Sequence, residues 1–338
     1  MSEAKILSPT TTQIESILRD YRIACESREA SIMGRKEVFM GKAKFGIFGD
    51  GKEVAQIAMA KAFRKGDFRS GYYRDQTFMM AIGELTVKEY FAQLYAITDV
   101  EAEPASAGRM MNGHFGTRMV DDNGELKDLT KMHNCISDIS PTAGQIPRII
   151  GLGYASTLFR LNKDLHKFKT LSNKGNEVVF GTIGNAATSE GMFLEAINAA
   201  GVLQIPVLFS VWDDGYGISV PNEFHTTKGS ISEALEGFRR DENKKGIEIY
   251  RVLGWDYEAL VETYENAAQM ARKEHVPVLI HVDEVTQPQG HSTSGSHERY
   301  KSKERLKWEK EYDCNKKLKE YIIESGFATA DELHKIEL

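Results

Sequence analysis

An asparagine and an aspartate lie 29 positions apart in a pattern that suits a divalent cation. Asn185 stands in Gly-Asn-Ala, and Asp214 stands in Asp-Asp-Gly-Tyr-Gly. An amide oxygen, a carboxylate and a loop carbonyl are the hard oxygen ligands of Mg²⁺, which keeps positions open for phosphate oxygens. The spacing therefore predicts a metal-bridged diphosphate site. The alternative is a pair of polar residues that only end two strands.

The residues around this pair have the pattern of one strand–helix–strand unit. Residues 177–182 form a β-branched run, and residues 188–204 carry apolar side chains at helical spacing, with Thr188 or Ser189 as the expected cap. Residues 207–212 form a second apolar strand. Parallel strands joined by such a crossover end at the same edge of the sheet, where ligands bind, and the helix would point free N–H groups into the same crevice.

These segments resemble a known family. GNAATSEG followed by DDGYGIS is similar to the thiamine-diphosphate motif of the transketolase-like superfamily. More narrowly, it resembles the alpha subunit of the first, decarboxylating component of 2-oxo acid dehydrogenase complexes. The family has an acid where Asn185 stands and an Asn where Asp214 stands, so the formal charge of the site is unchanged. Ala186 replaces the second glycine, which is harmless only if its φ is negative.

The resemblance also assigns cofactor residues. Tyr73 and Arg74 match a Tyr-Arg pair that holds the diphosphate, and a hydroxyl beside a planar guanidinium suits phosphate oxygens. Ser140 and the Thr142 backbone match positions at the aminopyrimidine. His291, in Gly-His-Ser-Thr-Ser, matches a histidine that reaches cofactor and substrate; without the resemblance, a lone loop histidine is expected to be solvent-exposed. The implied cofactor set is Tyr73, Arg74, Ser140, Thr142, Gly184, Ala186, Ala187, Asp214, Ile218 and His291, with His291 catalytic and Asn185, Asp214 and Tyr216 binding the metal.

Two other loops invite a functional interpretation. Residues 41–53 contain Gly-Asp-Gly, but no apolar strand precedes it, so we do not expect the cofactor motif there. The resemblance implies instead a loop that lines the substrate access with Phe45 and Phe48. His114 follows a Gly-Arg in a loop similar to one of the family, and a structural role for it is at least as favoured as a catalytic one. A monovalent-cation site of some relatives uses a Thr that is Gly144 here, so that site is not assigned.

Alternating strands and helices continue through the chain. Residues 247–253, 256–274 and 277–285 predict a second βαβ unit, so we expect a doubly wound parallel α/β sheet flanked by helices, the fold that the resemblance implies. One diphosphate-binding domain over 1–338 is expected. It would have an N-terminal helical arm over about 1–40, opened by a capping box of Thr12 and Glu15. Charged helices would end it over about 301–338, the run 301–324 being one helix with a solvated face.

Composition narrows the classes of partner. A net charge of −6 and a pI near 5.9 argue against nucleic acid or an anionic membrane as the main partner. No run approaches the ~20 apolar residues of a membrane span, and the start lacks a targeting pattern, so we expect a cytoplasmic protein. Cys25, Cys135 and Cys314 have no metal-binding spacing and are interpreted as buried free thiols.

The resemblance implies oxidative decarboxylation of a 2-oxo acid with thiamine diphosphate and Mg²⁺, and acyl transfer to a lipoyl group. Its closest branch acts on branched-chain 2-oxo acids, as a 3-methyl-2-oxobutanoate dehydrogenase. It also implies a beta subunit, or a beta half on the same polypeptide, that supplies the glutamate activating the cofactor. An α2β2 assembly and a lipoyl-bearing acyltransferase core are expected. Two alternatives stay open: pyruvate or acetoin as substrate, and a non-catalytic regulatory subunit with a degenerate cofactor site.

Overall fold

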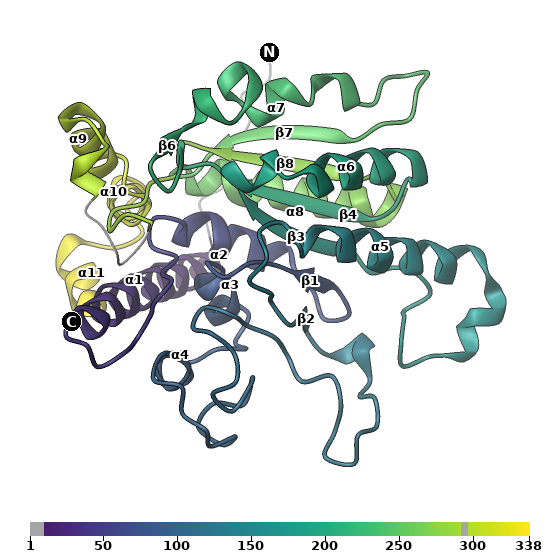
Figure 1. Ribbon diagram of the computed structural model, residues 1–338, viewed down its shortest axis with the longest axis horizontal. Helices are drawn as coiled ribbons and strands as arrows, with labels where there is room; N and C mark the ends of the chain where they lie inside the picture. The colour runs from purple at the N-terminus through teal and green to yellow at the C-terminus, as the bar shows by residue number, and fades with distance from the viewer. Residues whose placement is uncertain (1–9, 292–296) are drawn as a thin grey trace.

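A six-stranded parallel sheet forms the centre of the protein. The computed structural model describes residues 10–291 and 297–338 (Figure 1). The strands lie in the order β2-β1-β3-β4-β8-β7, and every neighbouring pair is parallel. Their bounds are Phe68–Ser70 (β1), Asn134–Ile136 (β2), Val179–Gly184 (β3), Val207–Trp212 (β4), Glu248–Leu253 (β7) and Val278–Asp283 (β8). The predicted doubly wound α/β sheet is confirmed.

Helices cover both faces of the sheet because the buried strands carry apolar side chains on both sides. One core contains side chains of α2 (Glu53–Ala62) and α8 (Tyr257–Glu274), and the other contains side chains of α5 (Ile146–Leu161) and α6 (Gly191–Leu203). Along β4, Leu208 and Trp212 face the first core, whereas Val207, Phe209 and Val211 face the second. The βαβ units β3–α6–β4 and β7–α8–β8 match the two predicted units.

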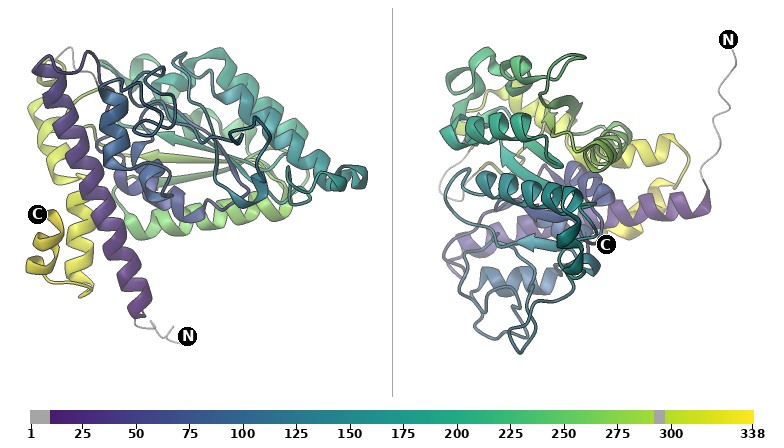
Figure 2. Two further views of the ribbon diagram at one scale, coloured as in Figure 1. Left: turned by 90° about the horizontal axis from the view of Figure 1, so that it is seen from below. Right: turned by 90° about the vertical axis from the view of Figure 1, so that its right-hand side faces the viewer.

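The long helix α1 (Thr11–Phe39) lies beside the C-terminal helices, as Figures 1 and 2 show. Its capping box uses Thr10 and Gln13, two residues before the predicted box. The predicted helix over 301–324 is two helices, α9 (Lys303–Glu311) and α10 (Cys314–Glu324), because the Asp313 carboxylate accepts from the Asn315 and Lys316 N–H groups and starts a new helix. The chain ends in α11 (Ala330–Glu337).

The remaining elements are short and lie in the connections. The further helices are α3 (Gln76–Ala81), α4 (Val87–Leu94) and α7 (Ile231–Ala234), and a hairpin of β5 (Tyr216–Gly217) and β6 (Val220–Pro221) follows β4. The 3-10 turns are η1 (Leu129–Lys131), η2 (Lys163–Lys167), η3 (Ala186–Ser189), η4 (Asn222–Phe224), η5 (Thr227–Gly229), η6 (Glu236–Phe238) and η7 (His297–Arg299). Across the ranges that the structure describes, no helix combines the length and the apolar character needed to cross a membrane.

The connection between β3 and α6 differs from its prediction. The residues after Asn185 form the 3-10 turn η3, and α6 begins only at Gly191, so neither Thr188 nor Ser189 caps it. The Thr188 hydroxyl instead donates to the Asn185 carbonyl at 2.6 Å and closes the turn. Ala186 has the helical backbone of this turn, which any L-residue adopts, so the missing glycine introduces no backbone strain.

Candidate functional site

A cavity of about 290 Å³ lies at the carboxyl edge of β3 and β4. The register pairs Gly184 with Trp212, so the residues that follow the two strands emerge side by side. Every predicted site residue lines this cavity except Ser140. The lining residues are Tyr72, Tyr73, Arg74, Thr142, Gly184, Asn185, Ala186, Ala187, Trp212, Asp214, Tyr216, Gly217, Ile218 and His291.

The Asp214 carboxylate is buried but keeps an acceptor position that no residue in the described part of the chain uses. Its Oδ2 lies 3.1 Å from Lys52 Nζ and 2.9 Å from His291 Nε2, and its Oδ1 accepts from the Tyr216 N–H at 3.1 Å. Burial raises the pKa of this carboxyl, but His291 and the Lys52 ammonium outweigh burial and hold the pKa well below its usual range. A carboxylate offers about four lone pairs, so these three contacts leave one for a ligand.

Asn185 offers a second oxygen to the cavity. Its Nδ2 donates to Asn222 Oδ1 at 2.5 Å, so its Oδ1 is the amide atom left for a ligand. Tyr216, whose carbonyl is the third predicted ligand, lines the same cavity. One charged oxygen and neutral oxygens at a cavity fit a hard cation such as Mg²⁺.

Lys52 is a site residue that the sequence prediction missed. Its side chain is 1 % exposed, and its Nζ lies 2.6 Å from Gln287 Oε1 in addition to Asp214. Its loop was expected to line the substrate access, but Phe48 packs in the core while Phe45 is exposed. That expectation was wrong for Phe48 because the core takes up its ring. The only sequence signal for Lys52 is its place just before α2, which is mostly apolar.

Contacts with Asp214 and Arg74 help to hold His291 in place. Its Nε2 faces Asp214, and its carbonyl accepts from Arg74 at 2.9 Å. Burial lowers the pKa of His291 more than Asp214 raises it, so the imidazole is neutral at pH 7 with Nε2–H as donor. Within the described residues its Nδ1 is buried and without a partner. The expectation of a solvent-exposed loop histidine is therefore wrong. The motif's residues 292–294 lie outside the described residues.

Arg74 binds backbone as well as facing the cavity. Besides the His291 carbonyl, it donates to the Phe48 carbonyl at 2.6 Å, which ties residues 48 and 291 together. A guanidinium carries five N–H donors, so two such bonds do not exhaust it. Its Cζ lies 5.7 Å from the centre of the Tyr73 ring. Arg74 thus positions His291 and keeps N–H donors free, and its binding of phosphate oxygens stays a prediction.

Ser140 and His114 form a separate pair in the loop region. Ser140 Oγ lies 2.9 Å from His114 Nε2, and His114 Nδ1 lies 3.3 Å from the Asn112 carbonyl. Because both ring nitrogens have partners, the geometry favours the structural interpretation of His114. The Ser140 hydroxyl is engaged here and does not line the cavity, so its contact with the aminopyrimidine stays a prediction. Thr142 does line the cavity.

Residues at the start of the C-terminal helices hold the loop that contains Asp214. Arg305 donates to the Asp214 carbonyl at 2.7 Å and to Glu309 at 2.9 Å, and Lys301 lies 2.7 Å from Glu309. Lys301 and Glu309 are only 5 % and 3 % exposed. The prediction of a solvated charged face was therefore wrong for these residues, because their charges pair with one another and pack against Tyr216.

The backbone after Asp214 is tightly constrained. Ile218 has φ +57°, which for a β-branched residue costs about 1–3 kcal/mol, and its side chain borders the cavity. A Cβ built on the neighbouring Gly217 would lie 2.6 Å from the Ala186 Cβ. Gly217 thus makes room for Ala186. Strain and close packing at these positions fix the shape of the cavity wall.

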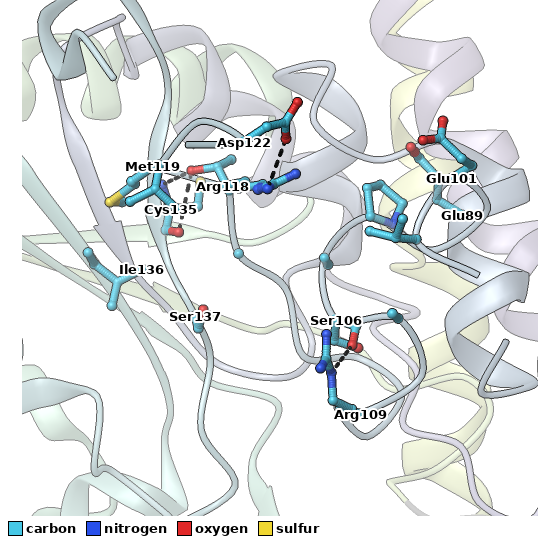
Figure 3. Close-up of a pocket in the computed structure, with 17 residues that line it drawn as sticks. Glu89, Glu101, Ser106, Arg109, Arg118, Met119, Asp122, Cys135, Ile136 and Ser137 are labelled. Atoms are coloured by element: carbon cyan, nitrogen blue, oxygen red, sulfur yellow. Dashed lines mark hydrogen bonds and ion pairs between the residues drawn. The ribbon is translucent and has the colours of Figure 1, made fainter. Parts of the chain in front are cut away.

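A larger cavity of about 1060 Å³ lies beside the edge strand β2 (Figure 3). Its cationic side chains have partners: Arg118 pairs with Asp122 at 3.0 Å, and Arg109 donates to the Ser106 carbonyl at 2.9 Å. Its thiol is Cys135, and burial raises the pKa of that thiol to about 12, so it is unreactive at neutral pH. The convergent polar groups lie in the smaller cavity, which is the candidate site.

The fold and the cavity define the class of protein: a parallel α/β protein with a polar cavity at the carboxyl edge of its sheet. Comparison with known sequences identifies the family. The sequence model of the family described as dehydrogenase E1 component matches residues 27–338, and the chain belongs to that family. The chain is 27 % identical over 299 residues to a 2-oxoisovalerate dehydrogenase subunit alpha of Bacillus subtilis, covering 88 % of this chain and 78 % of that protein. It is 26 % identical over 289 residues to the mitochondrial subunit of Mus musculus and 27 % over 290 residues to that of Homo sapiens. Each of these two matches covers 85 % of this chain and 56 % of the relative, so the chain spans little more than half of the mammalian proteins.

Proposed function

We propose that this chain is the alpha subunit of the first component of a branched-chain 2-oxo acid dehydrogenase, built as one diphosphate-binding domain. One observation carries the proposal: segments from β1 to β8 bring the predicted ligands to a single cavity. The names of the relatives in the bacterium and in mammals support the branched-chain substrate over pyruvate or acetoin. The cytoplasmic location stays a prediction.

In this proposal the chain binds thiamine diphosphate and Mg²⁺. Asn185 Oδ1, the free lone pair of Asp214 and the Tyr216 carbonyl would hold the metal, and Tyr73, Arg74 and the η3 backbone would hold the diphosphate. When bound, the cofactor would supply a nucleophilic carbon and an electron sink for the decarboxylation of a 2-oxo acid, while the residues named above would hold and orient it.

His291 is the group of this chain that can move a proton. Its imidazole is neutral, its Nε2–H is fixed by Asp214, and its Nδ1 has no partner in the described part of the chain. A neutral imidazole with one free nitrogen can accept a proton or receive a hydrogen bond from the substrate. Asp214 would stabilise the protonated form.

A beta subunit would complete the site in an α2β2 assembly that passes acyl groups to a lipoyl-bearing acyltransferase. The glutamate that activates the cofactor in the family is expected from that partner. An apolar stripe supports a protein interface: Tyr154, Leu158 and Leu161 are exposed along one side of α5. Exposed apolar patches of this kind mark interaction surfaces.

Activity with candidate substrates tests the proposal. The chain is co-expressed with its beta partner, and decarboxylation of 3-methyl-2-oxobutanoate and pyruvate and cleavage of acetoin are compared in kcat/KM. The branched-chain acid should be preferred by at least tenfold. Preference for pyruvate or acetoin would keep the family and overturn the substrate.

One observation favours the non-catalytic alternative, because the Lys52 ammonium already neutralises Asp214 without a metal. Calorimetric titration of the complex with thiamine diphosphate, with and without Mg²⁺, distinguishes the two. A functional site gives magnesium-dependent heat, whereas a degenerate site gives none.

A further inference from the structure

A chain of hydrogen bonds with a fixed polarity runs from Asp213 to Asn185. Asp213 accepts from Asn222 Nδ2 at 2.9 Å through Oδ1 and at 3.1 Å through Oδ2. A carboxylate only accepts, so Asn222 must turn its Nδ2 toward Asp213 and its Oδ1 the opposite way. That Oδ1 lies 2.5 Å from Asn185 Nδ2. The polarity of the chain therefore leaves the Asn185 oxygen as the atom for the cavity.

Because the amide of Asn185 stands where the family has an acid, metal binding depends on the direction of these hydrogen bonds. A carboxylate presents an oxygen to a cation in either of its two flipped orientations. An amide presents an oxygen in one orientation and an NH₂ group, which repels a cation, in the other. Asn185 can serve a metal only if something fixes its orientation, and the Asn222 oxygen does so by accepting from the Asn185 NH₂ group.

Asp213, where this series of hydrogen bonds begins, is itself held firmly. Besides Asn222, Asp213 accepts from the Gly215 N–H at 2.8 Å and lies 3.0 Å from His281 Nε2, and His281 Nδ1 lies 2.9 Å from Ser232 Oγ. Asp213 and His281 are both buried. A saturated, buried carboxylate cannot turn away from Asn222 without leaving several donors unpaired.

Asp213, His281 and Asp283 also lie close enough together to suggest a second metal centre, with their ligand atoms within 4.8 Å. Their contacts argue against that interpretation. Both Asp213 oxygens are used by the donors named above, and Asp283 pairs with Arg251 at 2.5 Å. The cluster is better explained as the anchor of Asn222.

We propose that Asn222, oriented by Asp213, is a positioning residue that locks the Asn185 amide with its oxygen toward the cation. This proposal rests on the proposed function, because it assumes that Asn185 binds Mg²⁺. It explains how an amide replaces the family's acid: the orientation that a carboxylate does not need is supplied by a neighbouring side chain.

A double-mutant cycle tests the lock. In the complex with the beta partner, Mg²⁺ is titrated calorimetrically at saturating thiamine diphosphate for the native protein, Asn222→Ala, Asn185→Asp and the double variant. Asn222→Ala alone should weaken Mg²⁺ binding about fivefold, the size of one hydrogen bond. In the Asn185→Asp background the same substitution should cause no loss, because a carboxylate at this position needs no orientation and the Asn222 oxygen would repel it.

A matched control and a second variant keep the test decisive. Asn315→Ala removes another amide, which donates to the Ala24 carbonyl at 3.0 Å and does not line the cavity, and should leave Mg²⁺ affinity unchanged. If Asn222→Ala does not assemble, Asp213→Asn removes the fixed polarity and should show the same background dependence. Equal losses in both backgrounds would mean that Asn222 is merely structural and would overturn the lock alone. No magnesium-dependent binding by the native complex would overturn the proposed function as well.

Discussion

The two edges of the central sheet both bury carboxylates, but they use them differently. At the amino edge, Asp67 accepts two bonds from Arg272, at 2.8 and 2.7 Å, and one each from the Val178 and Arg64 N–H groups at 2.9 Å. Glu177 is likewise filled by the hydroxyls of Ser156 and Ser172 and by a backbone N–H. These acids have no lone pair left, so they bind the fold together and nothing else.

At the carboxyl edge, the Asp214 carboxylate has three partners among the described residues, which leaves one acceptor position over. Nearby, the buried His291 Nδ1 and Gln287 Nε2 have no partner within the described residues. Burial and ion pairing are common to both edges, so neither identifies the site. Arg272 Nε and Asn134 Oδ1 at the amino edge also lack partners within the described residues. What distinguishes the carboxyl edge is that Asp214 and His291 border a cavity, where a ligand can use their free positions.

Substituting a histidine at each edge, His291 or His275, should give the largest difference, measured in kcat. His291→Gln removes the nitrogen that can exchange a proton and should lower kcat by a factor on the order of 10²–10⁴. Affinity for thiamine diphosphate should change by less than about tenfold, since other residues hold the diphosphate. His275→Asn at the amino edge is the control and should leave kcat unchanged. A full kcat in His291→Gln would remove the catalytic assignment.

Substituting a buried aspartate at each edge, Asp214 or Asp67, should give the next largest difference. Asp214→Asn removes the carboxylate of the metal set and should weaken magnesium-dependent cofactor binding about 100-fold. Adding Asn185→Asp returns a carboxylate to the pair and should recover at least tenfold of that loss. Asp67→Asn should destabilise the protein in urea without changing cofactor affinity, because it leaves Arg272 without its charge partner. Calorimetry measures the cofactor affinity, and urea denaturation measures the stability. Normal magnesium-dependent cofactor binding by Asp214→Asn would contradict the hypothesis that the acid and the amide have exchanged places in the metal site.

The sequence predicted the residues at strand ends and missed those that reach the site from elsewhere. Asn185 and Asp214 could be paired because a parallel crossover brings two strand ends together, and the register of β3 and β4 places them as expected. Lys52, Asn222 and Arg305 approach Asp214 or Asn185 from loops and from α9. Their positions depend on tertiary packing, which periodicity does not encode.

Predictions from local sequence patterns were wrong where the same residue type occurs in several kinds of structure. Thr188 resembles a helix cap, but its hydroxyl closes a 3-10 turn, and a cap and a turn favour the same side chains. The charged run after residue 300 resembles a solvated face, but Lys301 and Glu309 are buried as a pair. Charge alone does not reveal whether a partner of opposite sign will cover it.

Substituting a buried cationic side chain at each edge, Lys52 or Arg272, should give a smaller effect, measured in the free energy of unfolding. Lys52→Gln removes an ammonium from Asp214 and should lower the free energy of unfolding by about 2 kcal/mol without metal. Mg²⁺ with thiamine diphosphate should restore part of that loss, because the metal replaces the missing positive charge. Arg272→Gln, which breaks the pair with Asp67, should show no such recovery. Urea denaturation with and without the ligands measures both, and equal recovery would mean that Lys52 is only a structural cation.

The smallest expected effect is the pH dependence contributed by His275. Burial, aided by the Arg160 guanidinium, lowers the pKa of His275 to about 4, and its ring nitrogens face the Gly175 carbonyl and the Thr157 hydroxyl. The unfolded chain binds a proton below about pH 6.5 and the folded protein only near pH 4, so stability is full above pH 6.5 and falls as the pH drops through this window. His275→Asn should reduce that fall by roughly 1 kcal/mol in urea titrations at pH 7 and pH 4.5. Cofactor affinity at pH 7 should be the same in both proteins, because His275 does not line the cavity; a change in affinity would show that the edges are coupled.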